Sequence, residues 1–213
     1  MPPTTAIEKV TLYDLEQTFS LQETHDPTFF WECQENLPPL TAAEQQRLER
    51  VQAAYTNLER RSVLENTVKL AVIAPLLDLA GFFLPPFYVD TEKEVQISID
   101  DRGIQLRGRI DILVLKQQIW VLVIESKRAE LSLKVGIPQA LSYMLAAPSI
   151  EQQYPRQSLY GLVTNGSSFM FLKLLRQPQT LYARSREFLL NQDDGLGKTL
   201  QIMKRLGEIV GAG

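Results

Sequence analysis

The sequence predicts an α/β fold in which a mixed β-sheet is flanked by helices and preceded by an N-terminal helical extension. Residues 110–115 and 119–124 are apolar runs rich in Val and Ile, and the polar residues 116–118 separate them. This pattern is typical of a β-hairpin in a sheet that is covered on both faces. Segments with helical periodicity, residues 62–79 and 131–147, lie before and after the hairpin in the chain.

The first 59 residues are expected to form an acidic, largely helical extension to an α/β domain that spans residues 60–213. Residues 1–59 carry ten acidic and three basic residues, a net charge of −7, whereas residues 60–213 carry a net charge of +4. Thr41 and Glu44 have the spacing of a capping box, which predicts a helix from residue 41 to about residue 60.

A second helix is expected over residues 62–79, where Ser62 and Glu65 again have the capping-box spacing. Pro75 lies inside this segment and should kink or restart the helix, because proline lacks the N–H that an internal turn requires. Glu65 therefore has a structural explanation, as a side chain that binds free backbone N–H groups where the helix begins.

The remaining elements follow from periodicity and turn residues. Residues 92–99 alternate between apolar and polar and predict a half-exposed strand, with a hairpin turn at residues 100–103. A helix is expected over residues 131–147, but Pro138 disturbs its start. The alternative is a helix that begins near Pro138, with this proline near its first turn. A second hairpin is predicted over residues 159–174.

Residues 193–199 mimic the end of a phosphate-binding loop. The full pattern requires glycine at position 192, where this sequence has Gln192. We therefore expect a turn that leads into a final amphipathic helix instead of a nucleotide site. The inward-facing residues of this helix are expected to be Leu200, Met203, Leu206 and Val210.

Three charged residues stand in the apolar hairpin: Asp111, Glu125 and Lys127. Side chains alternate along a strand, so Glu125 and Lys127 share a face. A three-residue loop over residues 117–119 would place Asp111 opposite Glu125, and a loop over residues 116–118 would place it on a diagonal. A two-residue loop would send Asp111 to the other face unless a bulge intervened.

Two interpretations of these charges remain open. Directly opposed carboxylates repel each other, and one of them would hold a proton unless a cation lay between them. Mg²⁺ or Mn²⁺ suits such a site of oxygen ligands. In the structural alternative, Glu125 pairs with Lys127 and Asp111 pairs with Arg109 at the end of the sheet.

Composition narrows the function classes. No run reaches about 18 consecutive apolar residues, so no membrane-spanning helix is expected. The first residues lack the basic head and apolar core of a signal peptide, and a cytoplasmic protein is expected. One cysteine, Cys33, and one histidine, His25, exclude an internal disulfide and a Cys/His zinc site. Residues 102–134 hold seven basic and three acidic residues, an excess that would suit a phosphodiester substrate.

The hairpin and the helix after it carry motifs of a known nuclease superfamily. Residues 108–111, Gly-Arg-Ile-Asp, and residues 125–127, Glu-Ser-Lys, resemble the PD-(D/E)xK motif without its usual proline. Residues 139–143 resemble the Q-x-x-x-Y motif of the branch that includes the N-terminal domain of type I restriction enzyme R subunits. Residues 163–169 resemble a segment further along that domain, and the resemblance covers about residues 60–175.

This resemblance implies a restriction-endonuclease-like fold with an αβββαβ core and a Mg²⁺- or Mn²⁺-dependent deoxyribonuclease activity. It implies that Asp111 and Glu125 bind the metal, with Glu65 and the backbone carbonyl of Ser126 completing the protein ligands. Lys127 would position the attacking water and stabilise the charge that develops on phosphorus. The implied substrate-orienting residues are Arg109, Gln139 and Tyr143.

The predicted function is therefore metal-dependent hydrolysis of DNA phosphodiester bonds by a restriction- or repair-type nuclease, which could act as a homodimer. A non-catalytic DNA-binding module on the same fold is one alternative, and it predicts DNA affinity without metal-dependent cutting. A protein-interaction domain is the other alternative, and it predicts neither metal binding nor DNA binding.

Overall fold

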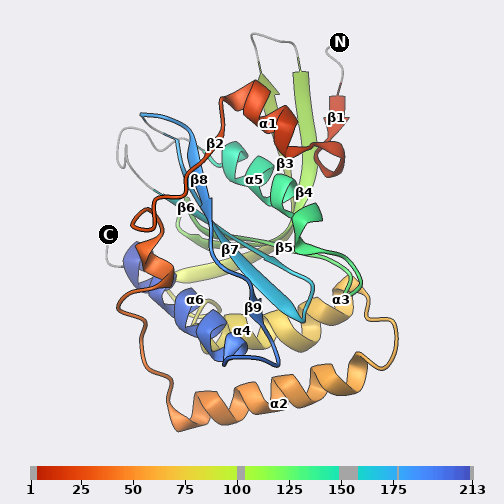
Figure 1. Ribbon diagram of the computed structural model, residues 1–213, viewed down its shortest axis with the longest axis vertical. Coiled ribbons are helices and arrows are strands. Elements are labelled where there is room, and N and C mark those ends of the chain that lie inside the picture. Colours follow the sequence, from red (N-terminus) through yellow and green to blue (C-terminus); the bar gives the residue numbers. More distant parts are fainter. Residues whose placement is uncertain (1–3, 100–103, 149–157, 177, 212–213) are drawn as a thin grey trace.

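The computed structural model describes residues 4–99, 104–148, 158–176 and 178–211. Within these residues, nine strands form one mixed sheet, and helices cover both of its faces (Figure 1). The strands are β1 (Thr4–Ala6), β2 (Gln22–Glu23), β3 (Phe87–Ile99), β4 (Ile104–Lys116), β5 (Ile119–Ser126), β6 (Leu159–Thr164), β7 (Ser168–Leu175), β8 (Leu181–Arg184) and β9 (Phe188–Leu189). The helices are α1 (Leu12–Phe19), α2 (Ala42–Leu58), α3 (Glu65–Val68), α4 (Ala74–Leu79), α5 (Ile137–Ala146) and α6 (Gly195–Gly211).

The predicted α/β class is confirmed. The helical segment α3–α4, the strands β3, β4 and β5, the helix α5 and the strand β6 follow one another in the expected αβββαβ order. β5 pairs in parallel with β6, whereas β3, β4 and β5 pair antiparallel, so the sheet is mixed as expected for a restriction-endonuclease-like fold.

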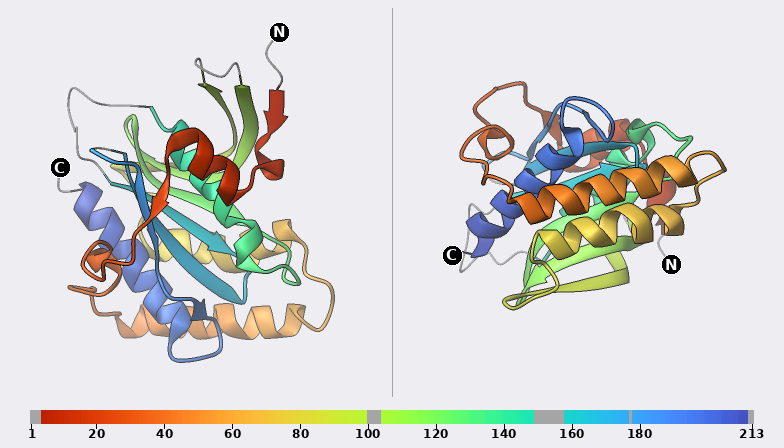
Figure 2. Two further views of the ribbon diagram at one scale, coloured as in Figure 1. Left: turned by 45° about the horizontal axis from the view of Figure 1, so that its top comes forward. Right: turned by 90° about the horizontal axis from the view of Figure 1, so that it is seen from below.

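Two hydrophobic cores lie on opposite faces of the sheet. Ile112 and Ile124 belong to the core under α2, α3, α4 and α6, and Leu113 and Val123 belong to the core under α1 and α5. Neighbouring residues of one strand thus enter different cores, because side chains alternate along a strand. Figure 2 shows α2 beside the α3–α4 segment on one face.

β4 is the strand that organises the site. β3 pairs along its whole length, while on the other edge β1 pairs with residues 105–107 and β5 pairs with residues 112–116. Between these two partners, residues 108–111 have no ladder partner on that edge within the described sheet. In this interval the Tyr143 hydroxyl donates to the backbone carbonyl of Arg109 at 2.8 Å.

The N-terminal residues contribute to the same sheet and core. β1 pairs with β4, and β2 pairs with β8. The buried carboxylate of Glu32 accepts hydrogen bonds from Lys173 Nζ at 2.6 Å and from the Tyr160 hydroxyl at 2.9 Å. Removing one partner from such a buried ion pair typically costs about 3–5 kcal/mol, so this contact ties the segment firmly to β7.

Only one of the two predicted capping boxes is present in the structure. The capping box of Thr41 and Glu44 is confirmed at the start of α2. The capping box predicted for Ser62 and Glu65 is wrong, because the N-cap of α3 is Leu64 and the Ser62 hydroxyl instead donates to Glu130 at 2.9 Å. The hairpin turn predicted at residues 100–103 lies outside the described residues.

The predicted effects of the two prolines are confirmed. Before Pro75, the helix widens into a π-helical turn, η3 (Lys69–Ile73), and then restarts as α4. A missing N–H at Pro75 leaves a backbone carbonyl in the preceding turn without its usual donor, and a widened turn is one way to accommodate this. Pro138 lies in the first turn of α5, after the 3-10 turn η5 (Leu133–Val135).

Candidate active site

The register of the β4–β5 hairpin brings the two predicted carboxylates face to face. The turn contains two residues, and a bulge shifts the pairing by one residue after Val114. The last pair of this register is Ile112 with Ile124, and the next residues along the two strands are Asp111 and Glu125. Asp111 therefore lies opposite Glu125. The bulge thus restores the arrangement that a plain two-residue turn would have destroyed.

The carboxylate of Asp111 is held by three donors. Its Oδ2 accepts hydrogen bonds from the backbone N–H of Ser126 at 2.8 Å and from the Ser126 hydroxyl at 3.1 Å. Its Oδ1 lies 2.6 Å from Lys69 Nζ. Arg109, the partner expected in the structural alternative, is exposed and points its guanidinium at Glu92, 3.4 Å away.

A chain of side-chain contacts connects the predicted residues of β5 and α5. Lys127 Nζ donates to Glu125 Oε1 at 2.5 Å and to Gln139 Oε1 at 2.7 Å. Gln139 Nε2 donates to the Tyr143 hydroxyl at 3.1 Å, which in turn donates to the backbone carbonyl of Arg109 at 2.8 Å. Gln139 and Tyr143 are buried, so their polar groups bond to protein atoms in this structure.

Glu125 is the most deeply buried carboxylate of the site, with 2% of its surface exposed. Its Oε2 atom is buried and has no hydrogen-bond partner among the described residues. Burial and the nearby charge of Asp111 raise the pKa of Glu125 to about 8, although Lys127 opposes this shift. Glu65 is half-buried at the start of α3, and its charge also raises the pKa of Glu125, by a smaller amount. The carboxylate of Glu65 therefore lies near the site.

Gly136 packs closely against Val163, beside the Glu125–Lys127 pair. A β-carbon at this position would stand 2.6 Å from Val163 Cγ1, 3.5 Å from Lys127 Cε and 3.6 Å from Glu125 Cγ. The backbone at Gly136 has φ of −84°, a value that any residue can adopt. Glycine is therefore favoured at position 136 because a β-carbon would clash with Val163, and not because of the backbone conformation.

Two residues of the site were missed from the sequence: Lys69 and Glu92. Lys69 contacts Asp111 and also lies 3.2 Å from Glu92 Oε1. Glu92 has a left-handed backbone with φ of 55° in the middle of β3. The available signal was the four-residue spacing of Glu65 and Lys69, which puts two charges on one face of a predicted helix.

The donor chemistry of Asp111 and Glu125 fits a hard divalent cation such as Mg²⁺ or Mn²⁺, because such ions prefer carboxylate oxygens. The buried Oε2 of Glu125 also fits, since a buried polar atom needs a partner and this one has none within the residues that the structure describes. As the side chains lie, no group of three or more Asp, Glu, His or Cys residues in the described ranges is arranged to hold a metal ion. Lys69 and Lys127 each bind one of the carboxylates.

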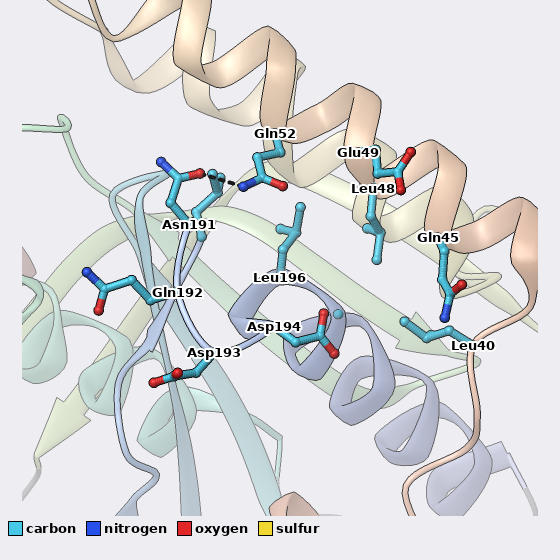
Figure 3. A pocket seen from close by; sticks show the side chains of 12 residues that line it. Leu40, Gln45, Leu48, Glu49, Gln52, Asn191, Gln192, Asp193, Asp194 and Leu196 are labelled. Carbon is cyan, nitrogen blue, oxygen red and sulfur yellow. Dashed lines mark hydrogen bonds between the residues drawn. The ribbon is translucent and has the colours of Figure 1, made fainter.

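A separate pocket of about 370 Å³ lies between α2 and the turn that precedes α6 (Figure 3). This turn includes Asp193 and Asp194, both with positive φ, from the segment that mimics a phosphate-binding loop. The carboxylate of Asp194 lies against Gly197, and acidic side chains there do not suit a phosphate. The predicted turn and amphipathic helix are confirmed, since the inward-facing residues of α6 are buried. They are Leu200, Met203, Leu206 and Val210.

Within the residues that the structure describes, no helix is both long and apolar enough to cross a membrane. The sequence matches no family model and no curated protein. Among solved structures, the chain is similar to a fragment assigned to the HsdR subunit of a type I restriction enzyme from Vibrio vulnificus YJ016. The identity is 18% and the TM-score is 0.39, and the match covers 70% of this chain and 26% of that chain. At this level of similarity the comparison assigns no function to the chain.

Proposed function

We propose that this chain is a metal-dependent nuclease that hydrolyses phosphodiester bonds in DNA, as its PD-(D/E)xK-like motif implies. The observation that carries the proposal is the contact network among the motif residues. Ser126 holds Asp111, and Lys127 links Glu125 to Gln139, which contacts Tyr143. These residues come from two strands and a helix.

Asp111 and Glu125 would hold Mg²⁺ or Mn²⁺, with Glu65 and the Ser126 carbonyl as further ligands. The bound ion would lower the pKa of a water molecule and neutralise negative charge on the phosphate. The Oε2 of Glu125, which has no hydrogen-bond partner in the described part of the chain, supports this assignment.

Lys127 would position the attacking water and stabilise the negative charge that develops on the phosphoryl oxygens. Its ammonium is held between Glu125 and Gln139, so its place is fixed before the substrate arrives. Because Gln139 and Tyr143 are buried, we assign them to positioning Lys127. The exposed guanidinium of Arg109 is better placed to meet the DNA backbone.

Two loops beside the site would contact DNA. The backbone N–H of Ala129 donates to the Val63 carbonyl at 3.5 Å and Ser62 donates to Glu130 at 2.9 Å, so residues 60–64 and 128–135 lie side by side. We call these two segments the basic rim. Its exposed cations, which form no ion pair within the described residues, are Arg60, Arg61, Arg128 and Lys134. Unpaired cations of this kind are available to bind phosphates.

A non-catalytic DNA-binding module is the second candidate. Asp111 Oδ1 is bonded to Lys69, and the Lys127 ammonium is bonded to Glu125 and Gln139. In this alternative the protein neutralises its own carboxylates, and the basic rim binds DNA without cutting it.

The test is incubation of the purified protein with plasmid and linear DNA in Mg²⁺, Mn²⁺ or EDTA. We expect cleavage only with a divalent cation, and a loss of at least about 100-fold in Asp111→Asn and Lys127→Met. Lys93→Met is the matched control, because Lys93 pairs with Asp90 within β3, outside the site.

DNA binding without cleavage in any metal would favour the second candidate. Equal cleavage by the parent protein and by Asp111→Asn would overturn the assignment of these residues. Circular dichroism of each variant shows whether a lost activity reflects a lost fold.

A further inference from the structure

We propose that Lys69 is a displaceable internal cation, which neutralises Asp111 in the metal-free protein and moves to Glu92 when a divalent cation binds. This inference rests on the proposed function, and it adds a residue that controls how readily the site takes up metal.

The position of Lys69 on Asp111 carries the inference. Asp111 Oδ2 already accepts two hydrogen bonds from Ser126, so Oδ1 is the oxygen that remains for a ligand. Lys69 Nζ lies 2.6 Å from this Oδ1. An ammonium and a divalent cation cannot share one carboxylate oxygen at such distances without strong repulsion. Metal binding at Asp111 therefore requires Lys69 to leave.

Glu92 offers the departing ammonium a second partner. Lys69 Nζ lies 3.2 Å from Glu92 Oε1 already, and a lysine ammonium has three donors. The register of β3 and β4 puts Glu92 opposite Asp111, between the Thr91–Ile112 and Lys93–Ile110 pairs. The movement is therefore a small rotation between two neighbouring acceptors.

The surroundings of Lys69 keep the ammonium charged and close to the site. Its side chain and that of Asp111 are mostly buried, with 16% and 14% exposed, whereas Glu92 is 53% exposed. Burial disfavours the charged lysine, but the hydrogen bonds and charges of Asp111 and Glu92 outweigh this and raise the pKa of Lys69. Lys69 begins the π-helical turn η3, and irregular turns of this kind are frequent at functional sites.

The test is direct Mn²⁺ binding, measured without DNA by the loss of the free Mn²⁺ signal in electron paramagnetic resonance. Lys69→Met should raise the Mn²⁺ affinity about tenfold or more, because the ion no longer competes with a charge-assisted hydrogen bond. Lys93→Met removes the same charge from a neighbouring position and should change the affinity much less. Lys69→Gln is the reserve variant, since it keeps a polar side chain if the methionine disturbs folding.

A double-mutant cycle tests the role of Glu92. Glu92→Gln should weaken Mn²⁺ binding, because Lys69 then has only Asp111 as a charged partner, and Asp90→Asn is the control for loss of a negative charge on β3. In the Lys69→Met background, Glu92→Gln should have no further effect beyond that control.

The outcomes separate this inference from the proposed function. If the parent protein binds Mn²⁺ and Lys69→Met binds it equally or more weakly, Lys69 supports the metal site and the inference is overturned while the nuclease proposal stands. If neither protein binds Mn²⁺, both fail. If only the Lys69 variants bind Mn²⁺, the inference is supported in its strongest form.

Discussion

Ser126 donates two hydrogen bonds to one oxygen of Asp111, from its backbone N–H at 2.8 Å and from its hydroxyl at 3.1 Å. The backbone bond comes from the last residue of β5, between Glu125 and Lys127. The orientation of Asp111 is therefore set by the same strand end that carries the other two proposed catalytic side chains.

Ser126→Ala tests this relationship. The variant loses the hydroxyl bond but keeps the backbone bond, so we expect a loss of about 1 kcal/mol in the free energy of unfolding. Cleavage of DNA should fall by about tenfold or less, since Asp111 keeps its main anchor. Urea unfolding and cleavage rates measure the two effects separately.

Ser142→Ala is the matched control for Ser126→Ala. Ser142 is equally buried, and its hydroxyl donates to the Pro138 carbonyl at 2.8 Å within α5. Its loss should cost similar stability and leave cleavage unchanged. If both variants cleave DNA as well as the parent protein, the hydroxyl of Ser126 has no part in the site.

Gly136→Ala should disturb the site by crowding it. The added methyl group would stand 2.6 Å from Val163 Cγ1 and within 3.6 Å of both Lys127 and Glu125. Overpacking of this kind costs about 1–3 kcal/mol, and we expect reduced cleavage because relief of the clash with Val163 shifts the start of α5, which carries Gln139. Urea unfolding and cleavage assays check both expectations.

The double variant Gly136→Ala with Val163→Ala provides the control, because it removes the closest clashing atom. We expect it to recover part of the lost cleavage although Val163→Ala alone is destabilising. An unchanged defect in the double variant would mean that the crowding argument is incorrect.

The hairpin and the helix after it could be predicted because their signals are local. Two runs of Val and Ile predict β4 and β5, and an Asn-Gly turn predicts the hairpin of β6 and β7. The position of Asp111 could not be predicted, because three placements of the loop were compatible with the sequence. The bulge after Val114 decided between them, and a bulge of this kind has no distinctive residue pattern.

Contacts between residues that are far apart in the chain could not be predicted from the sequence. Lys69 meets Asp111, 42 residues away, and a single lysine on a helix predicts no particular partner. β1, β2 and β9 have only two or three residues, too few to show a period of two. The capping box at Ser62 matched the residue pattern, but the chain there bonds to Glu130 instead.

The buried carboxyl of Glu125 predicts a distinct pH dependence for the metal-free protein. Its pKa is raised from the ordinary value to about 8 in the folded state. Between about pH 4.5 and pH 8 the unfolded chain releases this proton while the folded protein keeps it. The folded state then binds more protons, so the contribution of Glu125 to the free energy of unfolding falls as the pH rises.

Glu125→Gln isolates this effect. We expect the variant to gain stability relative to the parent protein as the pH rises from 5 to 8, by up to about 1 kcal/mol per pH unit. Urea unfolding in EDTA at several pH values measures the difference in the free energy of unfolding between the two proteins. The contributions of titratable groups that both proteins share cancel in this difference. Parallel stability curves would show that Glu125 stays ionised through its contact with Lys127.

The basic rim should carry a measurable share of the salt dependence of DNA binding. Arg128 and Lys134 are exposed and lie on the segment that connects β5 with α5, where Lys134 belongs to η5. If both contact phosphates, the variant Arg128→Ala with Lys134→Ala should lower the slope of log affinity against log salt concentration by up to about 2. Binding is measured in EDTA so that cleavage does not interfere.

Arg47→Ala with Arg50→Ala is the control, because both arginines are exposed on α2 and their removal changes the net charge equally. We expect this control to keep the parent slope, since a cation outside the basic rim that does not contact the bound DNA releases no counterions from it. The same change in slope for both pairs would mean that DNA binds by general charge attraction. In that case the basic rim would not be the surface that brings the phosphodiester to Asp111.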